Sequence, residues 1–83
     1  MTSLENIQDI VTIKEVMDKA LNNLYEGKPF STTEYLFGKT VFVYTENGDF
    51  GVEVIISSKE LDFAYVLDNS NSTQSEIIDA LLK

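Results

Sequence analysis

The side chains of this sequence that could do chemistry are mostly carboxylates, with a few tyrosines. The chain has 14 Asp and Glu residues against six Lys, and it contains no His, Cys, Trp or Arg. The absence of His and Cys excludes a Ser-His-Asp triad, a thiolate nucleophile and the common zinc sites. We therefore expect no catalytic residues and no cofactor.

Carboxylates alone could still hold a hard cation or form an acid–base pair. The segment Asp68-Asn69-Ser70-Asn71-Ser72 offers oxygen ligands, but it lacks the Gly and the distal Glu of an EF-hand loop. A loop that precedes a helix explains the same residues. The sequence singles out no pair of acids of the kind that glycosidases use. We expect neither a metal site nor enzyme activity.

The charge balance indicates which partners the chain can have. Its net charge is -8 and its sequence pI is about 4.2. Nucleic acids and anionic membranes bind mainly through Lys and Arg, so we expect no direct contact with either. The complementary partner is a basic protein surface, including one that normally holds DNA or RNA. The alternative is that the acids only keep a small protein soluble.

The length and composition favour one folded domain spanning residues 1–83. The chain is 43% hydrophobic and too short for a second core. It has no run of 18 or more apolar residues, and its first five residues lack the basic and apolar regions of a signal peptide. The lack of cysteine fits a reducing compartment. We expect a soluble cytoplasmic protein.

The N-terminal third has the apolar spacing of a helix. Between residues 13 and 25 the apolar positions recur at i, i+3, i+4 and i+7. Thr12 and Glu15 have the spacing of a capping box, Gly27 is placed for a C-terminal cap, and Pro29 prevents continuation. Ser3 could cap an earlier turn, as a separate segment or as the start of one bent helix. The sequence leaves both open.

From residue 30 onward the pattern changes to strands. Asn47-Gly48 suits a type I′ hairpin turn, which predicts that Glu46 faces Asp49, Val43 faces Val52 and Val41 faces Val54. One face then carries the valines with Ile56, and the other carries Phe42, Tyr44, Glu53 and Ile55. Flanking runs at 32–37 and 63–68 complete a four-stranded meander around the polar turn 57–60.

A second capping box at Thr73 and Glu76 predicts a short amphipathic helix at the C-terminal end. The fold class is therefore α+β: an N-terminal helix, a four-stranded antiparallel meander and a C-terminal helix, with both helices on the valine face of the sheet.

The sheet face opposite the helices is the candidate partner-binding surface. Its aromatic and acidic side chains have the composition of a protein-binding patch, because rigid rings fill pockets and carboxylates steer a basic partner. Like charges across the hairpin are unfavourable, which favours a function for the acidic tip. The predicted partner-binding residues are Glu34, Phe42, Tyr44, Glu46, Asp49, Glu53, Asp62 and Asp68. Alternatively, the N-terminal segment or a second copy of the chain covers this face.

In size, acidity and lack of cysteine the chain resembles small phage-encoded inhibitors that mimic DNA, namely the anti-CRISPR and anti-restriction proteins and the uracil-DNA glycosylase inhibitor. The order of the strands at 41–45 and 55–58, followed by the segment that runs into Asp68-Asn69-Ser70-Asn71, is similar to the sheet of the glycosylase inhibitor. That family's Gln-Glu-Ser-Ile segment has only Glu34-Tyr35-Leu36 as a nearest match here. Its second helix has no counterpart, and this chain adds a C-terminal helix.

The resemblance implies a non-enzymatic inhibitor that occupies the basic groove of a nucleic-acid-binding protein or nuclease. The other hypothesis is a small adaptor or regulatory protein that forms homodimers or docks through its aromatic sheet face. Salt dependence separates them, because electrostatic contacts are screened by salt and aromatic contacts are not.

Overall fold

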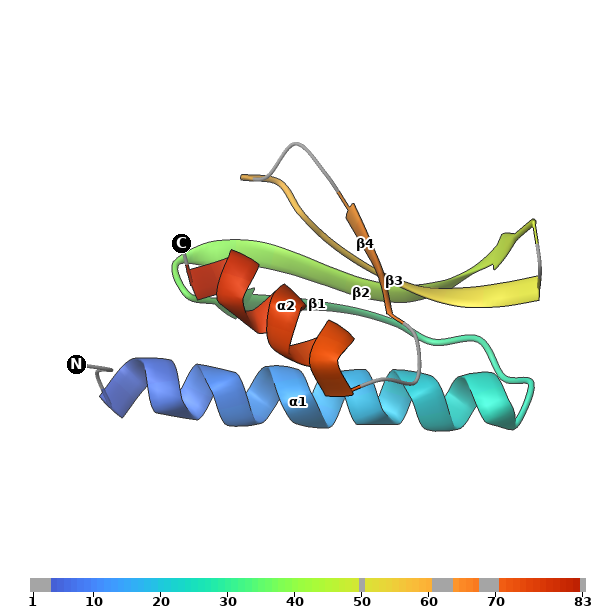
Figure 1. The fold of residues 1–83 in the computed structure, drawn as a ribbon, viewed down its shortest axis with the longest axis horizontal. Coiled ribbons are helices and arrows are strands. Elements are labelled where there is room, and N and C mark those ends of the chain that lie inside the picture. The colour runs from blue at the N-terminus through green and yellow to red at the C-terminus, as the bar shows by residue number, and fades with distance from the viewer. Residues whose placement is uncertain (1–3, 50, 61–63, 68–70, 83) are drawn as a thin grey trace.

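The computed structural model describes residues 4–49, 51–60, 64–67 and 71–82. These residues form a helix, a four-stranded sheet and a second helix (Figure 1). The elements are α1 (Leu4–Tyr25), β1 (Ser31–Leu36), β2 (Lys39–Gly48), β3 (Gly51–Ser58), β4 (Ala64–Leu67) and α2 (Asn71–Leu82). The strands follow one another in the order β1-β2-β3-β4, and all neighbours are antiparallel. The α+β class and the meander are therefore confirmed.

The N-terminal helix is a single continuous element of 22 residues. Thr12 does not cap a helix: it lies inside α1, and its hydroxyl donates a hydrogen bond to the carbonyl of Gln8, 3.1 Å away. The predicted C-terminal cap at Gly27 is confirmed. The amide of Gly27 bonds to the carbonyl of Leu24 at 3.1 Å and that of Lys28 to the carbonyl of Asn23 at 2.8 Å, which is the pattern of a Schellman motif.

A tight turn joins β1 to β2, and α1 supports it. Phe37 and Gly38 have φ angles of 55° and 71°, as a type I′ turn requires at both central positions. A phenylalanine is uncommon in this left-handed region. Its amide donates a hydrogen bond to the carboxylate of Asp9 in α1, 2.9 Å away, and its ring packs against the core. This turn ties the sheet to the helix that lies under it.

The β2–β3 hairpin has a different register from the predicted one. Gly48 pairs with Gly51, so Asn47 and Gly48 belong to the paired strand β2 and do not form the turn. Glu46 therefore pairs with Glu53, and Val43 pairs with Ile56. Each partner moves by four residues along β3. Because four is an even number, every side chain keeps its predicted face.

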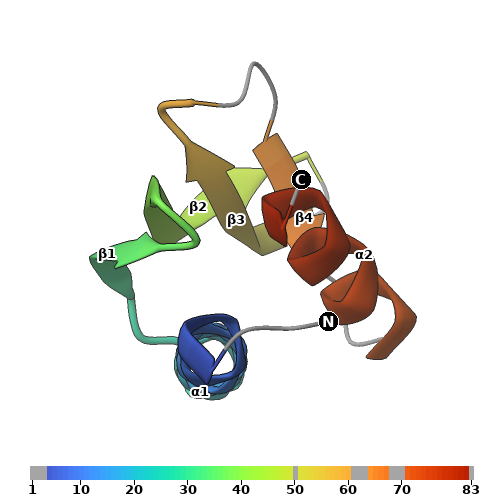
Figure 2. The same cartoon turned by 90° about the vertical axis from the view of Figure 1, so that its left-hand side faces the viewer.

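One apolar core fills the space between the sheet and the two helices. Figures 1 and 2 show α1 and α2 on the same side of the sheet, as predicted. The buried cluster takes side chains from all six elements: Ile13, Met17, Ala20, Leu21, Leu36, Val41, Val43, Val54, Ile56, Leu67, Ile77, Ile78 and Leu81. Neither helix covers the opposite face, which we call the outer face.

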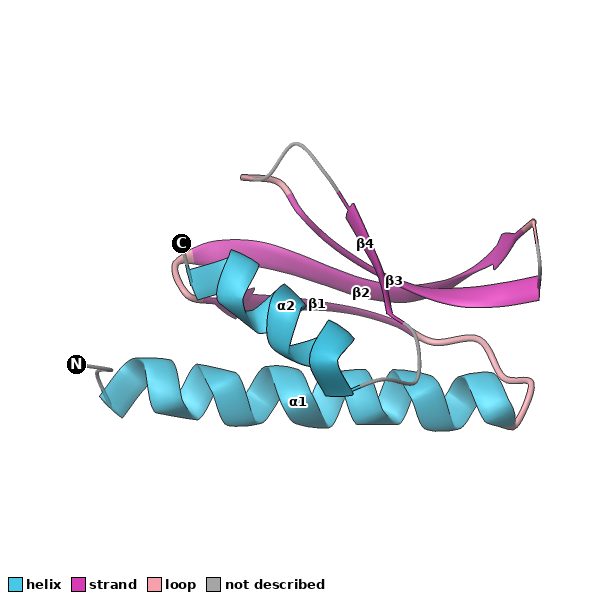
Figure 3. Cartoon of the chain, in the orientation of Figure 1, coloured by secondary structure: helices cyan, strands magenta, loops and turns pink. Residues whose placement is uncertain are grey.

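The C-terminal helix begins earlier than predicted. Asn71 is the first residue of α2, so Asn71 and Ser72 belong to the helix and not to a loop, and Thr73 is not its cap (Figure 3). The last turn of α2 is held by the sheet. The ammonium of Lys39 donates a hydrogen bond to the carbonyl of Leu81 at 2.9 Å, where a cation complements the helix C-terminus.

Candidate protein-binding surface

The outer face carries an apolar row beside an acidic row. Tyr44, Ile55 and Val66 are aligned across β2, β3 and β4 by the strand register. The next pair toward the hairpin loop on the same face is Glu46 with Glu53. Phe42 lies on the other side of the apolar row, also on this face. The structure thus places four of the predicted residues, Phe42, Tyr44, Glu46 and Glu53, on one surface.

The centre of the apolar row is buried. Ile55 is only 7% exposed, and Tyr44 and Val66 flank it on the two neighbouring strands. Val66 is 50% exposed, and Tyr35 on the edge strand β1 is 74% exposed. The outer face therefore has a filled centre and accessible apolar side chains toward both edges.

The acidic pair places two like charges opposite each other on neighbouring strands. The Thr45 amide donates a hydrogen bond to the carbonyl of Phe30 on the β1 side. By alternation along the strand, the backbone amide and carbonyl of Glu46 face β3, so Glu46 and Glu53 are a pair joined by backbone hydrogen bonds. Directly opposed like charges destabilise a sheet. Gly48 gives Glu53 room, because a Cβ at Gly48 would collide with the Glu53 carboxyl group. The missing side chain lets this carboxylate lie over the end of the hairpin.

The acidic pair lies on a part of the hairpin that extends past its neighbours, which we call the arm (residues 46–49 and 51–53). β1 pairs with β2 only as far as Tyr44, and the described part of β4 pairs with β3 only as far as Val54. Figure 1 shows the arm reaching beyond β1 and β4. Asp49 is exposed in its loop. Three carboxylates thus lie on a two-stranded ribbon.

Glu34 does not belong to this surface. In β1 it pairs with the buried Val41 and alternates with the exposed Tyr35, so it lies on the helix-facing side. Its carboxylate accepts a hydrogen bond from the Thr32 hydroxyl at 3.1 Å. The two remaining predicted residues, Asp62 and Asp68, lie outside the described residues.

Some acids have structural tasks. Asp9 holds the β1–β2 turn, and Glu60 closes the turn after β3 by accepting hydrogen bonds from the Ser58 hydroxyl at 2.9 Å and the Thr40 amide at 3.0 Å. The hydrogen bond from Ser58, and next that from Thr40, lower the pKa of Glu60 below its ordinary value of 4.5. Among the described residues, no hydrogen bond or ion pair involves the carboxylate of Glu46, Asp49 or Glu53.

No lysine lies on the arm itself. Lys14 and Lys19 alternate with acids along α1, whereas the sequence from residue 40 to residue 58 contains no lysine. Lys28 is the cation on the neighbouring α1–β1 loop, and its ammonium lies 3.3 Å from the Glu26 carboxylate. The arm is therefore a region of a single charge sign, whereas the exposed face of α1 carries both signs.

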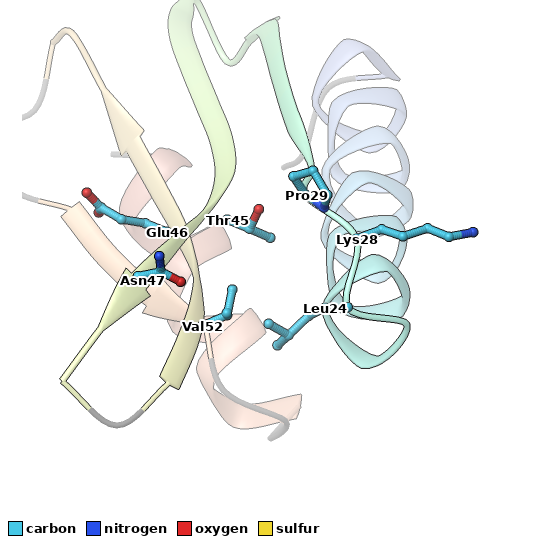
Figure 4. A pocket seen from close by; sticks show the side chains of 8 residues that line it. Leu24, Lys28, Pro29, Thr45, Glu46, Asn47 and Val52 are labelled. Atoms are coloured by element: carbon cyan, nitrogen blue, oxygen red, sulfur yellow. The ribbon is translucent and has the colours of Figure 1, made fainter.

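A pocket lies on the helix-facing side of the arm, between β2–β3 and the C-terminal end of α1 (Figure 4). Its volume is about 280 Å³, and it is lined by Leu24, Gly27, Lys28, Pro29, Thr45, Glu46, Asn47 and Val52. We call it the arm pocket. Sequence reasoning missed it because the predicted register placed Val52 opposite Val43 in the core. In the structure Val52 is 50% exposed.

Within the described residues, no three potential metal-ligating side chains gather at one point. None of the described helices is long and apolar enough to cross a membrane. No protein-family model, curated protein or solved structure matches the chain.

Proposed function

We propose that this protein is a non-enzymatic acidic inhibitor whose arm and outer face occupy the basic groove of a nucleic-acid-binding protein or nuclease. Its carboxylates would stand in for the phosphates of DNA or RNA, as in the anti-CRISPR and anti-restriction inhibitors that the sequence resembles. The inhibitor competes with the nucleic acid for the groove and performs no chemical step.

The observation that carries this proposal is the opposed pair Glu46 and Glu53. The two acids repel each other in the free protein, and the arm offers no lysine to neutralise them. A basic partner would relieve this repulsion on binding. An acidic surface that only maintains solubility needs no such pairing, and the mixed charges along α1 serve that purpose without it.

The experiment is capture from a cell lysate on the immobilised protein at low salt, followed by elution with DNA or heparin. We expect basic proteins to be retained and the polyanions to release them, since both compete for the same groove. The captured protein is then tested for nucleic-acid binding with and without the inhibitor. Retention of only neutral or acidic proteins, unaffected by polyanions, would contradict the proposal.

A charge reversal tests the residues. Changing Glu46 and Asp49 together to Lys should leave folding intact, because both side chains are exposed, and should weaken inhibition at least about tenfold. The matched control is Glu15→Lys with Asp18→Lys on α1, where the same change in net charge should have a much smaller effect. Equal losses for both variants would remove the arm from the proposed site.

A second function is favoured by the exposed apolar side chains of the outer face. Tyr35 and Val66 give an adaptor or regulatory protein a surface for docking or for homodimerisation. In that case the molecular mass in solution or the docking affinity should change little between low and high salt. Tyr35→Ser would weaken such an association, because this side chain is the most exposed of the large apolar residues described.

A further inference from the structure

The arm pocket is an unfilled continuation of the core. Val54 and Val52 lie on the same face of β3, and Val54 is completely buried, whereas Val52 is half exposed. The difference arises because the arm extends past the elements that cover Val54. Leu24 at the end of α1 and Val52 lie on opposite walls of the space, with Pro29 beside them (Figure 4). The pocket therefore offers apolar walls at the base of an acidic surface.

The size of the pocket is sufficient for side chains of a protein partner. Ligand sites for small molecules usually have volumes of about 300–1,000 Å³. The arm pocket, at about 280 Å³, lies just below that range and is open to solvent through the exposed Val52 and Asn47. One or two side chains of a protein partner would fill it.

The edge of β2 beside the pocket is suited to an added strand. The Thr45 amide donates a hydrogen bond to the carbonyl of Phe30, 2.9 Å away. The backbone amides and carbonyls of the odd-numbered residues of β2 therefore point toward the β1 side. The next such residue is Asn47. Opposite Asn47, the segment that precedes β1 has turned away toward α1 at Pro29, outside the paired part of β1. The amide and carbonyl of Asn47 therefore face an edge that β1 no longer occupies, and an extended peptide can pair with such an edge.

The charges around the pocket select the kind of peptide. Glu46 lines the pocket on the arm side, with Asp49 and Glu53 nearby on the same ribbon. The ammonium of Lys28 points away from the pocket in Figure 4 and lies beside Glu26. A strand added beside Asn47 presents alternate side chains to opposite faces of the sheet. One side chain would enter the pocket, and its neighbours would lie on the face that carries Glu46.

We infer that the arm pocket binds an apolar side chain of the partner, carried on an extended basic segment that pairs with the β2 edge at Asn47. This inference rests on the proposed function and specifies its partner: a segment in which apolar residues alternate with Lys or Arg. The carboxylates attract the segment, and the pocket fixes its register.

The test is a titration of the isotope-labelled full chain with two peptides, followed by NMR at low salt. One is a hexapeptide of alternating lysine and serine in which a single leucine replaces a central serine. The other peptide keeps serine at that position and therefore has the same charge. We expect the leucine peptide to bind about tenfold more tightly, because the leucine leaves water for the pocket. We also expect it to protect the Asn47 amide from hydrogen exchange.

Two matched variants locate the effect. Val52 and Val66 are both 50% exposed strand valines, but they lie on opposite faces of the sheet. Val52→Ser should abolish the preference for leucine, and Val66→Ser should leave it unchanged. Equal binding of the two peptides, binding of neither, or an equal response to both variants would overturn the pocket assignment.

A third variant separates this inference from the proposed function. Replacing Glu46 and Glu53 by Gln should weaken both peptides by the same factor while the preference for leucine remains. If the two peptides bind equally but this variant weakens both, the acidic arm stands and the pocket assignment fails. If the preference for leucine persists and this variant has no effect on affinity, the pocket stands and the electrostatic function fails.

Discussion

Neutralising Glu46 should stabilise the free protein, although Glu46 belongs to the proposed binding surface. Glu46 lies opposite Glu53 as a hydrogen-bonded pair of the antiparallel ladder. The two Cα atoms of such a pair are about 5.5 Å apart. Two unit charges about 6 Å apart in water repel each other by about 0.7 kcal/mol. Because Glu53 lies over Gly48, its carboxylate has room to move away from Glu46 and reduce this repulsion. We expect Glu46→Gln to raise the free energy of unfolding by about 0.2–0.7 kcal/mol.

The assay is thermal unfolding of the wild type and the variant at low salt and at 1 M salt. For a domain of this size the expected gain is a rise in Tm of about 1–4 °C. At 1 M salt the screening length falls to about 3 Å, so the gain should disappear. Changing Glu53 as well should add little, because the first substitution has already removed the pair.

The control is Glu15→Gln on α1, which changes the net charge equally but removes an acid four residues before Lys19. It should lower the stability slightly or leave it unchanged. A decrease in Tm for Glu46→Gln at low salt, or an equal increase at both salt concentrations, would refute the argument that the arm stores electrostatic repulsion.

Three further substitutions test the scaffold that presents the arm. Met17→Ala should lower the free energy of unfolding by about 2–5 kcal/mol in urea titrations, because it leaves a cavity at a side chain with no exposure, whereas a loss below about 1 kcal/mol would contradict that packing. Asp9→Ala removes the acceptor for the Phe37 amide and should cost about 1–2 kcal/mol in the same assay; an unchanged midpoint would show that the turn forms without it. Hydrogen bonding lowers the pKa of Glu60 in the folded state, so its contribution to stability is present above about pH 4.5 and is lost as the pH falls through the lowered value. Glu60→Gln should therefore flatten the dependence of stability on pH below 4.5, measured by unfolding at several pH values. An unaltered dependence would show that other carboxylates cause the loss of stability.

The fold class was predictable because the relevant signals are periodic. The apolar stripe of α1 and the alternation along β2 and β3 each extend over many residues, so one misplaced boundary does not alter them. The position of a hairpin turn depends on a few residues. Asn47-Gly48 is a favourable turn sequence, but a turn there would pair Val43 with Val52 and place Ile56 opposite Lys39 at the end of the sheet. The observed register buries Ile56 opposite Val43 and leaves the smaller Val52 outside.

The candidate surface was predictable in part, for the same reason. The face of each residue follows from odd or even position, which a shift of four residues preserves, so Phe42, Tyr44 and Glu53 are correctly placed. The partner of Glu46 depends on the exact register and was predicted wrongly. The arm pocket depends on how far each strand extends and on where α1 ends relative to Val52. No local sequence signal encodes those lengths.

The central claim is that the negative potential of the arm is the working part of this protein. The most direct measurement is the affinity for the captured partner as a function of salt concentration, for the wild type and for the variant with Glu46 and Glu53 changed to Gln. We predict a steep loss of wild-type affinity as salt rises and a shallower slope for the variant. Identical slopes, or an affinity that does not change with salt, would contradict the claim.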